Sequence, residues 1–159
     1  MYRIGLGSDI HRLETGKPLI LGGVSIESEK GAVGHSDADC LTHAVTDALL
    51  GALALGDIGL HFSDKDERWR GAESFVFLRF VVGLIKEKGF AVVNVDSTVS
   101  LETPRLRPHI DAMRENLANA LEIETASVSV KAKTGEKVDA VGKSEAVRAD
   151  AIVLLREGS

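Results

Sequence analysis

The sequence predicts a two-layer α+β fold in which helices cover a mixed β-sheet. Strand-like segments and segments with helical spacing of apolar residues follow one another along the chain. Glycine or proline separates most of them, as is usual at turns between elements. The 159 residues, 44% hydrophobic and 27% charged, suit one domain spanning residues 1–159. A helical bundle and a β-sandwich both fit this pattern less well.

The N-terminal part is predicted to hold two strands and one helix. Residues 2–13 and 18–21 have strand character, and the glycines at 22–23 and 31–34 mark turns. A loop with His35 and Ser36 leads into a helix that ends near Gly56. Residues 56–66 are predicted to be a polar loop. The apolar stripe of the helix consists of Ala38, Leu41, Val45, Ala48, Leu49, Ala52 and Leu55.

The C-terminal part is predicted to hold two helices and three strands. The first helix covers residues 73–88, and Gly89 follows it in the position of a C-cap. Its buried face is expected to consist of Phe75, Leu78, Val82 and Ile85. A strand over 91–101, a helix over 108–121 and strands over 127–132 and 149–155 complete the chain. The sheet face without helices is a candidate oligomer interface.

Asp9, His11 and His43 form a candidate metal site. Residues i and i+2 of a strand point to the same side, so Asp9 and His11 can face one ion. His43 lies on the polar face of the first predicted helix. These ligands suit zinc with an open fourth position, although ordinary hydrogen bonding of an Asp-x-His pair remains an alternative. Asp39 or Asp47, one turn to either side, is expected to orient His43.

Composition narrows the classes of partner. A net charge of −5 argues against nucleic acid and against an acidic membrane surface. The single cysteine, Cys40, excludes an internal disulfide and is predicted to be a small buried residue. The sequence contains no apolar run long enough to span a bilayer and no signal-peptide core, so a cytoplasmic location is the expectation.

Taken in order, seven motifs resemble the family of 2-C-methyl-D-erythritol 2,4-cyclodiphosphate synthases. Together they cover nearly the whole chain. They are Asp9-Ile10-His11, His35-Ser36-Asp37-Ala38-Asp39, His43, Gly56-Asp57-Ile58-Gly59, Phe62-Ser63-Asp64-Lys65-Asp66, Pro104-Arg105-Leu106-Arg107-Pro108-His109 and Val130-Lys131-Ala132-Lys133-Thr134-Gly135-Glu136-Lys137.

The resemblance implies a chorismate-mutase-like homotrimer of subunits with a mixed four-stranded sheet and helices on one face. Active sites would lie between subunits. It also implies a phosphorus–oxygen lyase of the non-mevalonate (MEP) isoprenoid pathway. In that reaction 4-diphosphocytidyl-2-C-methyl-D-erythritol 2-phosphate closes on itself and releases CMP, with no water consumed.

The resemblance also assigns roles to residues. Asp9, His11 and His43 would hold Zn2+ against the β-phosphate, and Glu136 would hold Mg2+ or Mn2+ between the α- and β-phosphates. His35 and Thr134 would stabilise the transition state. The methylerythritol pocket is expected to be formed by Ser36, Asp57, Ile58 and Gly59, with an outer wall of Phe62, Ser63, Asp64, Lys65 and Asp66.

The cytidine side is expected to be formed by Leu101, Glu102, Thr103, Pro104, Arg105, Leu106, Arg107, Ala132, Lys133 and Thr134. Ile10, Gly135, Ala140 and Lys143 complete the predicted contacts. Lys133, Gly135 and the pair Asp139-Ala140 depart from the commonest bacterial pattern. Ala140 in particular puts in doubt a trimer cavity for isoprenoid diphosphates, for which Lys143 still offers a cation.

Two other functions remain open at this point. A metal-dependent phosphohydrolase would need a base to activate water, and Asp57 and Asp64 are candidates. A non-catalytic trimeric binding protein would be expected to have lost Thr134 or Glu136, and both are present. His61, His109 and Trp69 are predicted to be structural.

Overall fold

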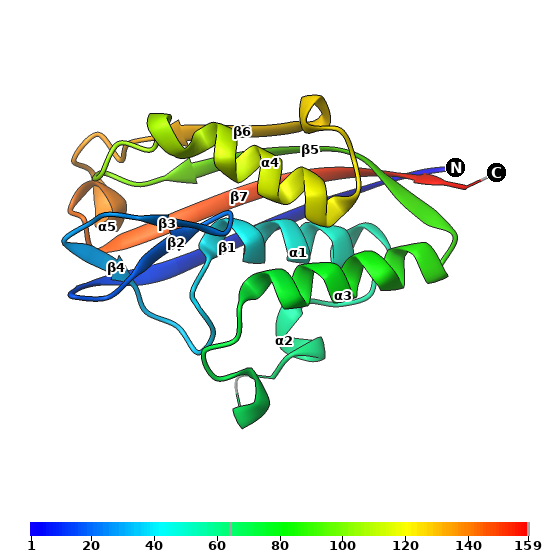
Figure 1. Cartoon of the computed structure of the whole chain (residues 1–159), viewed down its shortest axis with the longest axis horizontal. Helices are drawn as coiled ribbons and strands as arrows, with labels where there is room; N and C mark the ends of the chain where they lie inside the picture. The colour runs from blue at the N-terminus through cyan, green and yellow to red at the C-terminus, as the bar shows by residue number, and fades with distance from the viewer. Residues whose placement is uncertain (64, 159) are drawn as a thin grey trace.

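The structure is a computed structural model that describes residues 1–63 and 65–158 (Figure 1). The elements run in the order β1 (Tyr2–Thr15), β2 (Leu19–Leu21), β3 (Val24–Ile26), β4 (Lys30–Ala32), α1 (Cys40–Ala52), α2 (Ile58–His61), a 3-10 turn (Glu67–Trp69), α3 (Ser74–Glu87), β5 (Phe90–Ser100), a 3-10 turn (Arg107–His109), α4 (Ile110–Leu121), a 3-10 turn (Thr125–Ser127), β6 (Val128–Lys133), α5 (Asp139–Gly142) and β7 (Ala146–Glu157).

A mixed sheet with the strand order β4-β1-β7-β5-β6 forms one layer. Only the β5–β6 pair is parallel, and the other pairs are antiparallel. Helix α1 packs on β1 and β7, α4 packs along β6, and α3 lies against both helices (Figure 1). The predicted mixed sheet with helices is confirmed. The implied strand count of four omitted the short edge strand β4, which pairs with the last residues of β1.

Two glycines let α1 lie directly on β1. A Cβ atom at Gly5 would be 1.9 Å from the carbonyl oxygen of Ala48, and one at Gly7 would be 2.0 Å from that of Ala44. No side chain fits at these distances, so only glycine allows the helix backbone to approach the strand this closely. His43 precedes Ala44 on α1, so the close packing also places its side chain beside the continuation of β1.

The opposite face of β1 and β7 carries exposed apolar side chains beside the polar Ser8, Arg148 and Asp150. Ile4 is 70% exposed, Leu6 is 68% exposed and Ile10 is 57% exposed. Ile152 stands across from Leu6 in the antiparallel pair, so the two side chains share this face. An exposed apolar patch of this kind is typical of a protein–protein contact.

Several element boundaries differ from the sequence prediction. The segment around Gly31 is strand β4 rather than a turn, and a Cβ at Gly31 would meet the carbonyl oxygens of Lys17 and Pro18 at 2.1 Å. Strand β3 was not predicted. Helix α2 lies inside the predicted polar loop, and its N-cap is Asp57, whose carboxylate accepts a hydrogen bond from the amide of Leu60. These elements are too short to carry a periodic signal.

Candidate metal centre

Asp9, His11 and His43 meet at one point, as their spacing predicted. Oδ2 of Asp9 lies 2.9 Å from Nε2 of His11 and 3.1 Å from Nδ1 of His43. The two ring nitrogens are 3.2 Å apart. Strand β1 presents Asp9 and His11 on its helix-covered face, and α1 supplies His43. Two nitrogens and one carboxylate oxygen in such a cluster form a candidate metal site.

The hydrogen bond of His11 determines which ring nitrogen can bind a metal. Nδ1 of His11 lies 3.0 Å from the carbonyl oxygen of Val33. A carbonyl oxygen only accepts, so Nδ1 must carry the proton, and Nε2 directs a lone pair toward Asp9 in the neutral ring. The two ring nitrogens and one carboxylate oxygen therefore fit a zinc ion with three protein ligands.

Asp9 and His11 also alter each other's protonation. Burial by itself would raise the pKa of Asp9, but hydrogen bonds and charge from His11 and His43 hold it well below its usual value. Burial opposes the charged form of His11, yet its hydrogen bond to Asp9 raises its pKa above 6.5. Below the raised pKa of His11 the two residues form an ion pair in the metal-free protein, and a metal ion must then displace the His11 proton.

The expectation that Asp39 or Asp47 orients His43 is wrong. Asp39 caps α1 by accepting from the amide of Thr42 at 3.0 Å, and its carboxylate also accepts from the amides of Gly22 and Gly23 at 2.9 and 2.7 Å. Asp47 accepts from the amide of Ile58 at 2.7 Å. Both carboxylates hold backbone of other segments instead of the imidazole. An aspartate directly before a helix is a common N-cap, so the capping role of Asp39 could have been predicted from the sequence.

Two serine hydroxyls contact the second nitrogen of His43. Oγ of Ser74 lies 2.8 Å from Nε2, and Oγ of Ser36 lies 3.1 Å from it. No local sequence signal links Ser74 to a histidine 31 residues earlier. Cys40 is buried, as predicted, and donates its thiol hydrogen to the carbonyl oxygen of Asp9.

The residues predicted for the cytidine side line one cavity of about 450 Å3. Its wall consists of Leu101, Glu102, Thr103, Pro104, Arg105, Leu106, Arg107, Ala132, Lys133 and Thr134. The amide of Gly135 donates to Glu102 at 3.0 Å, and the hydroxyl of Thr134 donates to Glu136 at 2.8 Å. The loop after β6 is thus joined to the loop after β5.

Within one chain this cavity lies apart from the metal ligands. Asp9 pairs with Ala149, Ala149 with Val99, and Val99 with Ala132 across the sheet. Three strand spacings correspond to about 14 Å. Ala149 and Val99 are fully buried under the helices, so packed core fills the space between the two sites on this face.

Most of the other predicted contact residues lie around α2 or near α5. Asp57, Ile58 and Gly59 begin α2, and Ser63 and Lys65 are exposed beyond it, whereas Asp64 lies outside the described residues. The ring of Phe62 stacks on Phe77 with centroids 4.5 Å apart, so its side chain belongs to an aromatic cluster with Trp69 rather than to an open wall. Asp66 is paired with Arg68. Ile10 and Ala140 line a cavity of about 610 Å3, and Lys143 ends α5 nearby.

This fold and site define a two-layer α+β protein with a mononuclear candidate metal centre at a strand–helix junction. The sequence pattern of the YgbB family matches residues 2–156. The chain therefore belongs to the YgbB family. No helix in residues 1–63 and 65–158 has both the length and the apolar character needed to cross a membrane.

Named relatives agree with the resemblance drawn from the motifs. The 2-C-methyl-D-erythritol 2,4-cyclodiphosphate synthase of Synechococcus sp. is 56% identical over 155 residues, which are 98% of this chain and 99% of the relative. The protein of that name from Solibacter usitatus is 54% identical over 98% of both chains. A solved synthase of this name in a CDP-bound form is 44% identical, with a TM-score of 0.90 over 97% of this chain and 100% of the other.

Proposed function

We propose that this chain converts 4-diphosphocytidyl-2-C-methyl-D-erythritol 2-phosphate to 2-C-methyl-D-erythritol 2,4-cyclodiphosphate and CMP. The observation that carries the proposal is the convergence of Asp9, His11 and His43 in a chain similar to named synthases over nearly its whole length. Relatives solved in CDP-bound form support a cytidine diphosphate substrate.

The reaction needs positioning more than proton transfer. An oxygen of the substrate's 2-phosphate forms a bond to the β-phosphorus, while the bond from that phosphorus to the CMP oxygen breaks and CMP leaves with the electron pair. The attacking phosphate is already ionised near neutral pH, so no general base is required. Orientation of the two phosphates and stabilisation of the shifting charge therefore account for the catalysis.

Asp9, His11 and His43 would hold Zn2+, which when bound supplies a Lewis acid for a phosphate oxygen. Glu136 would hold a second ion, Mg2+ or Mn2+, because hard cations prefer carboxylate and phosphate oxygens. The carboxylate of Glu136 is exposed and is fixed by the Thr134 hydroxyl at 2.8 Å, which suits a ligand that meets substrate at the surface.

His35 and Thr134 would donate hydrogen bonds to phosphate oxygens as charge moves toward CMP. Among the described residues, Nε2 of His35 is buried without a hydrogen-bond partner, so it is available to donate to a ligand oxygen. The loop of His35 lies against the metal ligands, because a Cβ at Gly34 would be 3.1 Å from the ring of His11. Asp57, exposed at the start of α2, is suited to accept hydrogen bonds from the substrate's hydroxyl groups.

In a homotrimer with shared active sites, the metal ligands of one subunit would lie next to the cytidine cavity of another, although the two are separated within one chain. In one chain about 14 Å of packed core lies between them, so the cavity of one subunit would complete the metal site of its neighbour. The exposed apolar face with Ile4, Leu6 and Ile10 supports such an assembly.

Product analysis in oxygen-18 water tests the proposal. The protein, loaded with zinc and magnesium, is incubated with the cytidyl substrate and followed by phosphorus NMR and mass spectrometry. We expect the cyclic diphosphate and CMP, both free of heavy oxygen. A linear product that carries one heavy oxygen would identify a hydrolase, and binding without turnover would identify a non-catalytic binding protein; either result refutes the proposal.

Two variants link the chemistry to the site. His43→Ala should abolish turnover while the protein stays folded, because it removes one of three ligands. His109→Ala removes a histidine outside the site and should retain turnover, so it is the matched control. CMP release by His43→Ala at the rate of His109→Ala would contradict the metal's role.

A further inference from the structure

Ser74 connects the metal ligand His43 to a second carboxylate, that of Asp37. Ser74 is the first residue of α3 and is completely buried. Its hydroxyl lies 2.8 Å from Nε2 of His43 and donates to Oδ1 of Asp37. We propose that Ser74 and Asp37 are positioning residues that fix the tautomer and orientation of His43 and thereby set the affinity for zinc. The inference rests on the metal site of the proposed function.

The direction of these hydrogen bonds follows from the donors and acceptors present. The Asp37 carboxylate receives the Ser74 hydroxyl, the Ser74 amide at 3.0 Å and the Asp39 amide at 3.1 Å. An ionised carboxylate only accepts, so the single hydroxyl hydrogen of Ser74 points to Asp37. The lone pairs of that hydroxyl are then left to accept from His43, which places a proton on Nε2.

That proton has a consequence on the other side of the ring. When zinc is bound, a neutral imidazole protonated at Nε2 leaves the lone pair of Nδ1 for the metal, and Nδ1 is the atom that lies 3.1 Å from the Asp9 carboxylate. A metal-bound histidine commonly gives its second N–H to a carboxylate, which orients the ring and makes it a better ligand. Here a serine hydroxyl stands between the histidine and the carboxylate.

Ser74 is better placed for this role than Ser36. The Ser36 hydroxyl is farther from Nε2, at 3.1 Å, and it also lies 3.4 Å from the amide of Ala38. The Ser74 hydroxyl donates to the Asp37 carboxylate, and this hydrogen bond makes the hydroxyl oxygen a stronger acceptor for His43. Substitution of Ser36 should therefore affect zinc binding less than substitution of Ser74.

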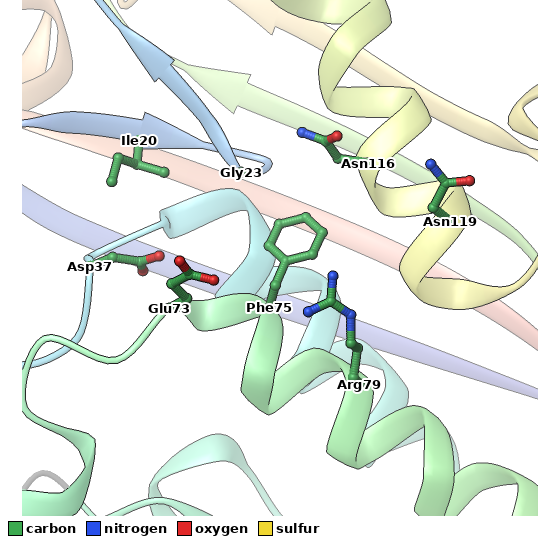
Figure 2. A pocket seen from close by; sticks show the side chains of 8 residues that line it. All are labelled: Ile20, Gly23, Asp37, Glu73, Phe75, Arg79, Asn116 and Asn119. Atoms are coloured by element: carbon green, nitrogen blue, oxygen red, sulfur yellow. The ribbon is translucent and has the colours of Figure 1, made fainter.

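Backbone hydrogen bonds hold together the segments that carry Ser74 and Asp37, which we call the relay. The amide of Asp37 donates to Ala72 at 3.0 Å, and the amide of Gly71 donates to His35 at 2.8 Å. These hydrogen bonds join the loop before α1 to the segment that leads into α3. Asp37 also lines a cavity of about 330 Å3 between the β2–β3 hairpin, α3 and α4, where Figure 2 shows it beside Glu73.

Zinc affinity of the full-length protein tests the relay without any measurement of turnover. The protein is stripped with a chelator, and its affinity for zinc is measured by competition with a chromophoric chelator. Ser74→Ala should weaken zinc binding about 10- to 100-fold. Ser74→Thr keeps the hydroxyl and should restore most of the affinity. Asp37→Asn should weaken binding by less than Ser74→Ala, since the hydroxyl acceptor remains.

Ser97→Ala is the matched control for a purely structural effect. It removes a hydroxyl that is also buried and that donates to the carbonyl oxygen of Ser129, far from the metal ligands in the sheet. It should leave zinc affinity unchanged, even if both alanine variants lose some thermal stability. NMR of the zinc-loaded protein should show a slowly exchanging proton on Nε2 of His43, which loses its protection only in Ser74→Ala.

The outcomes separate the relay from the metal site. If Ser74→Ala binds zinc as tightly as Ser97→Ala, or if the Nε2 proton is equally protected in both, the relay is refuted while the metal site stands. If the unaltered protein fails to bind zinc, the metal site and the relay fall together.

Discussion

Gly7→Ala should push helix α1 away from strand β1 and open the metal site. The added Cβ would lie 2.0 Å from the carbonyl oxygen of Ala44, whereas ordinary contacts are 3.4 Å or longer. The helix must therefore withdraw by roughly 1 Å, and it carries His43 with it. Because the three ligand atoms lie within 3.2 Å of one another, a shift of this size spoils their common geometry.

The strain should cost about 1–3 kcal/mol, which corresponds to a melting temperature about 2–12 °C lower for a domain of this size. Zinc affinity should fall as well, and both are measurable by calorimetry and chelator competition. Gly83→Ala is the control, because its Cβ would meet nothing within 4 Å and alanine favours a helix. If Gly7→Ala melts and binds zinc like Gly83→Ala, the close helix–strand contact does not position the site.

Four further predictions concern the pH dependence of zinc binding, the pH dependence of stability, the thiol and the assembly. At a pH below the raised pKa of His11, this residue must lose a proton to bind zinc. The apparent zinc affinity should therefore fall about tenfold for each unit by which the pH is lowered, as measured by competition titrations. In the metal-free protein, the lowered pKa of Asp9 stabilises the fold above pH 3.8, and the raised pKa of His11 stabilises it below pH 6.5. The free energy of unfolding, measured by denaturation, should therefore contain both contributions in full between these two pH values. It should lose the Asp9 contribution at lower pH and the His11 contribution at higher pH. Burial raises the pKa of Cys40, so a thiol reagent should label it only after unfolding. Leu6→Glu should dissociate the assembly in light scattering, whereas Arg79→Glu on α3 should not; a stable trimer with Leu6→Glu would contradict the proposed interface.

The long elements were predictable because their signals are local. The strand over β1 and the helices α1, α3 and α4 follow from spacing of apolar residues within each segment. The predicted buried face of α3 is confirmed, with Phe75 at 8% and Leu78, Val82 and Ile85 at 3% or less exposed. Strands β2, β3 and β4 have three residues each, and their pairing depends on partners elsewhere in the chain, so only β2 was predicted.

The metal ligands show the same division. Strand and helix periodicity placed Asp9 and His11 on one face and His43 on a polar stripe, and these three residues do meet. The partner of His43 was mispredicted because a one-turn spacing says which residues are near along a helix but not which other segment docks there. The Asp39 carboxylate instead accepts hydrogen bonds from the amides of Gly22 and Gly23. These amides lie in the β2–β3 hairpin, whose position against α1 was not predicted from the sequence.

By itself, the sequence determined the family to which the chain belongs, through its motifs, and it pointed to Asp9, His11 and His43 as candidate metal ligands. Tertiary structure decided how close the layers come, through Gly5 and Gly7, and which groups surround the ligands. It placed Ser74 and Asp37 beside His43, and it separated the candidate metal ligands from the cavity predicted to take cytidine by packed core. The physical reason is range: side-chain periodicity acts over a few residues, whereas contacts between segments depend on how whole helices and strands pack.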